Sequence, residues 1–191
     1  VESAETFIRL APAFGTDLVK CTPGAPASAA CEEKHWNLLC RALENLVPVA
    51  QTIGVRLAFE THMRQLTDTL KSSLRFVELA GSEQLGLTVD YSNLAFAGEN
   101  PIEAAKQLLP YTFHAHIKNG IVRPDGSWHF GALDEGLTYY PPILRLLRDS
   151  GYEGALSVEC LGQDAKEKPE ETAVRDLKIL MNWLEQLESP A

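Results

Sequence analysis

The chain has 191 residues, of which 45% are hydrophobic and 23% are charged, a composition typical of one globular domain. Its formal net charge of −9 disfavours nucleic-acid binding, because such affinity depends on clustered lysine and arginine. No segment has the apolar length of a membrane span, and the four cysteines form no CxxC pair, which is typical of reduced thiols in the cytosol. We therefore predict one domain over residues 1–191 that is cytoplasmic, is not bound to a membrane and acts on a small molecule.

Helices and strands are predicted to alternate along the chain. The apolar spacing indicates a helix over 2–14 that ends at Gly15, a strand over 17–21, and a long amphipathic helix over 32–53 that contains Pro48. The connection over 119–140 has no clear period, which is typical of a functional lid. The remaining predicted elements are a strand ending at Glu60, a helix over 67–80 with Thr67 as N-cap, a strand ending at Asp90, a helix over 101–109, a strand containing His116, a helix over 141–151, a strand ending at Glu159 and a helix over 170–187.

Four of the predicted strands share one pattern of side chains. Each ends on a residue that can bind a hard divalent cation, and the residue two positions earlier, on the same face, is small or polar. The opposite face carries bulky apolar residues, among them Phe59, Val89 and Phe113, which helices would cover. The ligand and the preceding residue in each strand are Glu60 with Ala58, Asp90 with Thr88, His116 with His114, and Glu159 with Ser157.

This alternation of strand and helix predicts an α/β fold with a parallel sheet. A small and polar face suits the interior of a (β/α)₈ TIM barrel near its mouth, whereas strands of a doubly wound sheet are apolar on both faces. Only five of the eight strand-helix units of such a barrel are predicted here. The sequence is therefore the C-terminal part of a barrel that lacks its first three units, or an open sheet, or a part that pairs with another chain.

Several stretches resemble the xylose isomerase-like TIM barrels, in their branch of sugar phosphate isomerases and epimerases. They are AQTIGVRLAFETH, LGLTVDYSN, HAHIKNG and GALDEGLTYYPPILRLLRDSGYEGALSVE, so the resemblance covers nearly the whole chain and the C-terminal two-thirds of the barrel. It implies that the last four strands each give one ligand to a divalent metal. Asn93 and Asn119 stand where the family often has a histidine and an aspartate. The implied ligands are Glu60, Asp90, His116 and Glu159.

Three carboxylates and one imidazole suit Mn²⁺, Mg²⁺ or Co²⁺ better than Zn²⁺ or another thiolate-seeking metal. The resemblance implies that Glu60 and Glu159 flank the substrate as an acid/base pair and move a proton through a metal-stabilised enediolate. We therefore expect a metal-dependent isomerase or epimerase of a sugar or keto sugar. The alternatives are an inosose-type dehydratase, a zinc AP endonuclease, which the net charge of −9 and the five histidines disfavour, and a non-catalytic fragment.

Other polar residues are expected to lie near these ligands and to contact the carbohydrate. His62 lies two positions beyond Glu60, and Lys118 lies two beyond His116. Arg64 and Trp128 are placed in loops on the same rim. The sequence leaves open whether the protein is a monomer or a homo-oligomer. The predicted substrate-binding residues are His62, Asn93, Lys118 and His129.

Overall fold

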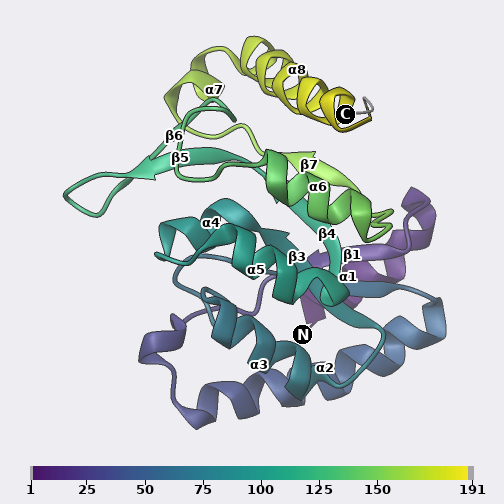
Figure 1. Ribbon diagram of the computed structural model, residues 1–191. Coiled ribbons are helices and arrows are strands. Elements are labelled where there is room, and N and C mark those ends of the chain that lie inside the picture. The colour runs from purple at the N-terminus through teal and green to yellow at the C-terminus, as the bar shows by residue number, and fades with distance from the viewer. Residues whose placement is uncertain (1, 189–191) are drawn as a thin grey trace.

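A curled parallel sheet of five strands forms the centre of the computed structural model, which describes residues 2–188 (Figure 1). The strand order is β1-β2-β3-β4-β7, and every neighbouring pair is parallel, as the alternation of strand and helix predicts. The sheet is a half-barrel with helices around it, which confirms an incomplete (β/α)₈ architecture. Its strands are β1 (Leu18–Cys21), β2 (Arg56–Glu60), β3 (Leu85–Asp90), β4 (Thr112–Ile117) and β7 (Leu156–Val158).

Helices connect the strands and cover the outer face of the sheet. Apolar residues recur every three or four positions in α2, and Trp36, Leu43 and Ala50 on this stripe are buried. Figure 1 places α2 and α3 at one end of the molecule and α8 at the other. None of the helices within residues 2–188 combines the length and apolar character needed to span a membrane. The helices are α1 (Glu2–Leu10), α2 (Glu33–Ile53), α3 (Leu70–Ala80), α4 (Tyr91–Phe96), α5 (Pro101–Leu108), α6 (Pro141–Asp149), α7 (Gln163–Glu167) and α8 (Pro169–Glu188).

One of these helices, α3, begins later than predicted, and another, α4, was not predicted. The N-cap of α3 is Thr69, whose hydroxyl accepts a hydrogen bond from the Ser72 amide. Thr67 was the wrong choice, because its hydroxyl donates instead to the Glu60 carbonyl at 2.6 Å and ties this loop to β2. The short helix α4 follows β3 without a loop, since the carboxylate of Asp90 accepts from the amide of Asn93 and caps it.

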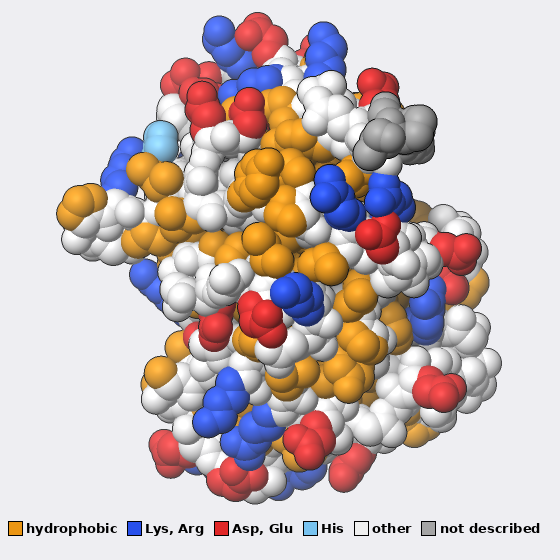
Figure 2. All heavy atoms as spheres, in the orientation of Figure 1, with side chains coloured by type: hydrophobic (Ala, Val, Ile, Leu, Met, Phe, Trp, Pro, Cys, Tyr) orange, Lys and Arg blue, Asp and Glu red, His pale blue; other side chains and the backbone are white. Residues whose placement is uncertain are grey.

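The connection after β4 is more regular than its sequence suggests. It forms an antiparallel hairpin of β5 (Asn119–Val122) and β6 (Trp128–Gly131), which projects from the body of the molecule in Figure 1. Arg64, from the loop after β2, lies over the Trp128 ring at 4.5 Å and joins the hairpin to the sheet end. Figure 2 shows apolar side chains along this projection and across the middle of the face, while charged side chains concentrate toward the two ends.

The alternation of side chains along the strands fails at one position. The register between β3 and β4 shifts between Leu87 and Thr88, and this irregularity changes the face on which Phe113 lies. Phe113 was predicted to lie under the helices. Its ring instead packs beside Gly86 and under the Arg56 guanidinium, which lies 5.0 Å from the ring centroid. Both neighbours lie on the inner face of their strands, so Phe113 fills the inside of the half-barrel.

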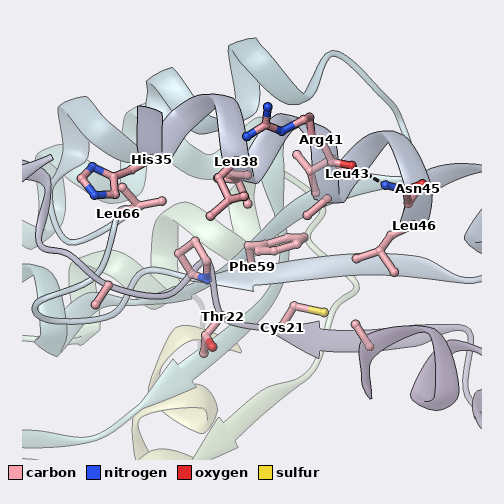
Figure 3. Close-up of a pocket in the computed structure, with 15 residues that line it drawn as sticks. Cys21, Thr22, His35, Leu38, Arg41, Leu43, Asn45, Leu46, Phe59 and Leu66 are labelled. Carbon is pink, nitrogen blue, oxygen red and sulfur yellow. Dashed lines mark hydrogen bonds between the residues drawn. The ribbon is translucent and has the colours of Figure 1, made fainter. Parts of the chain in front are cut away.

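A cavity of about 510 Å³ separates α2 from β1 and β2 (Figure 3). Figure 3 shows Phe59 and Cys21 facing this space from the strands, with Leu38 and Arg41 on the helix side. Phe59 and Glu60 are consecutive, and their side chains therefore point to opposite faces of the sheet. The cavity thus belongs to the helix layer, whereas the carboxylate of Glu60 faces the interior of the half-barrel.

Candidate metal centre

Four side chains, three from the ends of β2, β3 and β4 and one from the residue directly after β7, meet at the C-terminal end of the sheet. One potential ligand atom from each lies within 4.8 Å of every other. Nδ1 of His116 is 3.2 Å from Oε1 of Glu60, 3.1 Å from Oε1 of Glu159 and 3.9 Å from Oδ2 of Asp90. Parallel strands bring their C-terminal ends to one edge, which explains how residues up to 99 positions apart meet. We refer to Glu60, Asp90, His116 and Glu159 as the quartet.

Backbone and hydroxyl contacts hold the first two carboxylates in place. The Thr61 hydroxyl accepts from the Asp90 amide at 2.8 Å, and the Thr61 amide donates to the Thr88 carbonyl at 3.0 Å. Thr67 holds the carbonyl of Glu60, as described above. These bonds join the ends of β2 and β3, so the two carboxylates are fixed relative to one another by buried groups that water does not reach.

Lys118 lies inside the site as a counter-charge. Its ammonium is 2.7 Å from Oδ2 of Asp90 and 2.9 Å from Oε2 of Glu159, and its side chain is only 4% exposed. The main chain is clamped as well, because the hydroxyls of Ser92 and Tyr140 both donate to the Lys118 carbonyl, at 2.5 and 2.6 Å. Lys118 is therefore a rigid part of the centre, and its charge is already engaged by two carboxylates.

A second lysine reaches the quartet from the edge strand. Nζ of Lys20 on β1 lies 2.5 Å from Oε2 of Glu60, and 44% of the Lys20 side chain is exposed. Sequence reasoning identified the strand but overlooked this residue. Lys20 alternates with apolar Val19 and Cys21, and this pattern places its side chain on the inner face, so the signal was present in the strand.

The surroundings give the two buried acids opposite pKa shifts. Burial alone would raise the pKa of Glu60, but hydrogen bonds with His116 and Lys20 and the charge of Lys20 outweigh it and lower the pKa to about 2. Burial raises the pKa of Asp90 above its ordinary value, and the attraction of Lys118 opposes this shift. Burial of Lys118 would lower its pKa, but attraction to Asp90 outweighs this effect and raises the pKa.

The chemistry of this donor set fits a divalent cation. Three carboxylates and one imidazole converge on one point, and oxygen-rich sets with one nitrogen are typical of Mg²⁺, Mn²⁺ and related ions. Glu60 is ionised at neutral pH and can therefore act as a ligand without first losing a proton. The quartet of side chains could thus hold one metal ion.

The other predicted substrate-binding residues have different surroundings in the structure. Asn93 is buried beside it and donates from Nδ2 to the Thr61 carbonyl, while its Oδ1 has no hydrogen-bond partner among residues 2–188. His62 is partly buried in the loop after β2, where Nδ1 lies 2.9 Å from the Met63 carbonyl. The exposed His129 is on the hairpin, and its Nδ1 lies 2.9 Å from a guanidinium nitrogen of Arg123.

Two polar residues near the site have structural partners. The side chain of Asn119 donates to the carbonyls of Leu133 and Thr138, and its oxygen accepts from the amides of Gly120 and Thr138. Asn119 thus organises the loop after the hairpin. His114 lies one layer below His116, and its Nε2 lies 2.8 Å from the Ser157 hydroxyl, as expected for a packed interior histidine.

The sequence is similar to two named dehydratases. It is 24% identical over 159 residues to an inosose dehydratase from Clostridium botulinum, an alignment that covers 75% of this chain and 53% of that protein. It is also 24% identical over 196 residues to a 3-dehydroshikimate dehydratase from Bacillus anthracis, covering 95% of this chain and 68% of that protein. The chain thus spans about half the length of the first relative.

Solved structures show the same fold at low sequence identity. One is a xylose isomerase-like TIM barrel protein from Mycobacterium smegmatis in complex with magnesium, which is 24% identical with a TM-score of 0.76. The match covers 96% of this chain and 67% of that protein. Another is a D-tagatose 3-epimerase-like protein, which is 22% identical with a TM-score of 0.78, and the match covers 96% of this chain and 67% of that protein. The family described as xylose isomerase-like TIM barrel matches residues 1–186, and the chain belongs to this family.

Proposed function

We propose that the protein is a divalent-metal-dependent dehydratase that removes water from a cyclic hydroxy ketone. The observation that carries this proposal is the convergence of the quartet within 4.8 Å at the C-terminal end of the strands. The names of the two relatives, an inosose dehydratase and a 3-dehydroshikimate dehydratase, support loss of water as the reaction. Both names describe compounds in which a ketone lies beside carbons that carry hydroxyl groups.

Glu60, Asp90, His116 and Glu159 would hold the metal, which we propose to be Mg²⁺, Mn²⁺ or Co²⁺. A cation held there would supply Lewis acidity, which would stabilise negative charge on the ketone oxygen during proton loss from the neighbouring carbon. With a pKa of about 2, Glu60 is a weak base and is suited to ligation. Of the two glutamates predicted as an acid/base pair, Glu159 is therefore the better candidate for moving the proton.

Glu159 can serve at both ends of the elimination. It lies directly after β7 and is 29% exposed, whereas Glu60 is 2% exposed, so a substrate entering from the mouth reaches Glu159 first. Its carboxylate accepts the proton from the carbon beside the ketone and returns it to the hydroxyl that leaves the next carbon. One C–H and one C–O bond break, a C=C bond forms, and one molecule of water is released.

Removal of the same proton would also begin an epimerisation, the reaction predicted first from the sequence. The two reactions diverge after this step, because an epimerase returns the proton to the same carbon and a dehydratase loses the hydroxyl. We place the dehydratase first because the names of both curated relatives support it.

The test uses inosose and 3-dehydroshikimate in deuterated buffer with Mg²⁺, Mn²⁺ or Co²⁺. We expect one of them to lose water in a reaction that a chelator abolishes, and Glu159→Gln to slow it by about 10²–10⁴-fold, as is typical for loss of a general base. Glu103→Gln, on the exposed surface of α5, is the matched control and should keep full activity. Deuterium uptake without loss of water would identify an epimerase instead, and an unchanged rate in Glu159→Gln would refute the assignment of the base.

A further inference from the structure

We propose that Lys20 binds a carboxylate of the substrate and so makes the site selective for an acidic hydroxy ketone over a neutral one. This inference rests on the proposed function, because it concerns the same site and narrows its substrate class. It concerns a residue on β1, the strand at the margin of the sheet that contributes no member of the quartet.

The position of Lys20 is suited to contact with a substrate. In the register of the sheet it lies beside Ala58, on the same face as Glu60, and its side chain extends to Oε2 of that residue. The contact at 2.5 Å engages one of the three donors of the ammonium group. Since 44% of the side chain is exposed, a molecule that enters the half-barrel can reach it.

The two lysines of the site differ in this respect. Lys118 is 4% exposed, and its ammonium lies between the carboxylates of Asp90 and Glu159. It is therefore committed to neutralising charge within the protein. Lys20 contacts one carboxylate and is open to solvent. Of the two lysines, it is therefore the one that can exchange bound water for a group on the substrate.

The charges of the site favour a ligand with one negative charge. The three carboxylates of Glu60, Asp90 and Glu159 are opposed by the two ammonium groups. A bound divalent cation would therefore leave one net positive charge at the C-terminal end of the half-barrel. A carboxylate balances this charge, whereas a phosphate dianion exceeds it and a neutral polyol leaves it uncompensated.

The pairing with Glu60 accounts for one donor of the Lys20 ammonium group and leaves the others without an assigned partner in the part of the chain that the structure describes. A surface role would leave unexplained why the side chain lies on the inner face of the sheet, with its ammonium against Glu60 of the quartet.

The proposal is tested by equilibrium binding of two probes that carry ring hydroxyls and no ketone, so that neither can be dehydrated. The probes are shikimate, which carries a carboxylate, and myo-inositol, which is neutral. Calorimetric titrations with the 191-residue chain and Mg²⁺ compare the wild type with Lys20→Met, Lys20→Gln and Lys20→Arg. Lys34→Met, which removes an exposed lysine of α2 that pairs with Glu32, is the matched control.

We expect the wild type and Lys34→Met to bind shikimate more tightly than myo-inositol. Lys20→Met and Lys20→Gln should raise the Kd for shikimate by about tenfold or more, the typical effect of losing a hydrogen bond to a charged group. The Kd for myo-inositol should not change, and Lys20→Arg should retain the preference for the acid. Raised salt should weaken shikimate binding to the wild type, which tests the charge without any substitution.

An unchanged Kd for shikimate in both neutral variants would overturn the proposal, and so would an equal loss for both probes or the absence of shikimate binding to the wild type. These outcomes are separate from those for the proposed function, because neither probe is turned over. If neither ketone is dehydrated but the binding pattern holds, the dehydratase assignment fails and the role of Lys20 stands. If inosose is dehydrated but Lys20→Met leaves the Kd for shikimate unchanged, the dehydratase assignment stands and the role of Lys20 fails.

Discussion

Replacing Lys118 with methionine tests whether the metal and this lysine share the task of neutralising the site. The substitution keeps a flexible apolar chain of similar length and removes the charge that lies 2.7 Å from Asp90 and 2.9 Å from Glu159. The carboxylate of Asp90 is fully buried, so water cannot replace the lost cation. The variant therefore leaves a buried negative charge without its principal partner.

The expected loss is about 3–5 kcal/mol in the free energy of unfolding, the typical cost of breaking a buried ion pair by removing one partner. Urea unfolding with a chelator present measures this loss against the wild type. It should shrink as the pH falls, because the pKa of Asp90 is already raised by burial and protonation removes the uncompensated charge. Addition of Mg²⁺ should recover part of the loss, since a cation held by the quartet restores positive charge beside Asp90.

Lys106→Met provides the matched control, because Lys106 is an exposed lysine on α5 whose ammonium lies 3.8 Å from Glu103. Its effect should stay within about 0.5 kcal/mol, as is usual for surface substitutions. If Lys118→Met unfolds at the same urea concentration as Lys106→Met in the presence of chelator, Lys118 is not the counter-charge that holds the carboxylates together. A loss that Mg²⁺ does not reduce would refute the shared role of metal and lysine.

Two further substitutions test the electrostatics and the packing of the half-barrel. The pKa of Glu60 falls from 4.5 to about 2 on folding, so this residue stabilises the fold above pH 4.5 by about 3 kcal/mol, and the contribution is lost as the pH falls toward 2. Urea titrations at pH 6 and pH 3 should therefore show a larger loss for the wild type than for Glu60→Gln. Gly86→Ala should cost about 1–3 kcal/mol, because the new Cβ would lie 2.6 Å from the Phe113 ring, and thermal unfolding measures that cost.

Each of these two predictions has a matched comparison. Parallel pH curves for the wild type and Glu60→Gln would show that the charge of Glu60 adds no stability. For Gly86→Ala, the double variant with Phe113→Leu should recover much of the loss, because the smaller side chain makes room for the methyl group. If both losses simply add, Phe113 is not the residue that Gly86 accommodates.

Sequence reasoning was strongest where a pattern repeats along the chain. Four predicted strands alternate small or polar residues with bulky apolar ones and carry Glu60, Asp90, His116 or Glu159 near their ends. This alternation was enough to predict that these four side chains share a face and meet at one end of a parallel sheet. Such a pattern is visible in sequence because strand geometry fixes side-chain direction at every second residue. Gly15 likewise marks the end of the first predicted helix, since it adopts the left-handed conformation there.

What the sequence did not reveal depends on contacts between distant segments. Thr67 and Thr69 are equivalent as caps by residue type, and the choice between them is made by the carbonyl of Glu60, which engages Thr67. Phe113 changes face because of a register shift between two strands, which no single strand encodes. The role of Lys20 depends on the neighbouring strand, since its partner lies 40 positions further along the chain.

The different exposure of the two lysines has an effect on how they respond to their medium. Because 44% of the Lys20 side chain is exposed, dissolved ions can screen its attraction to Glu60. Only 4% of the Lys118 side chain is exposed, so mobile ions have little access to its contacts with Asp90 and Glu159. The half of the centre around Glu60 is therefore sensitive to ionic strength, whereas the half around Asp90 keeps its attraction in dilute and concentrated salt alike.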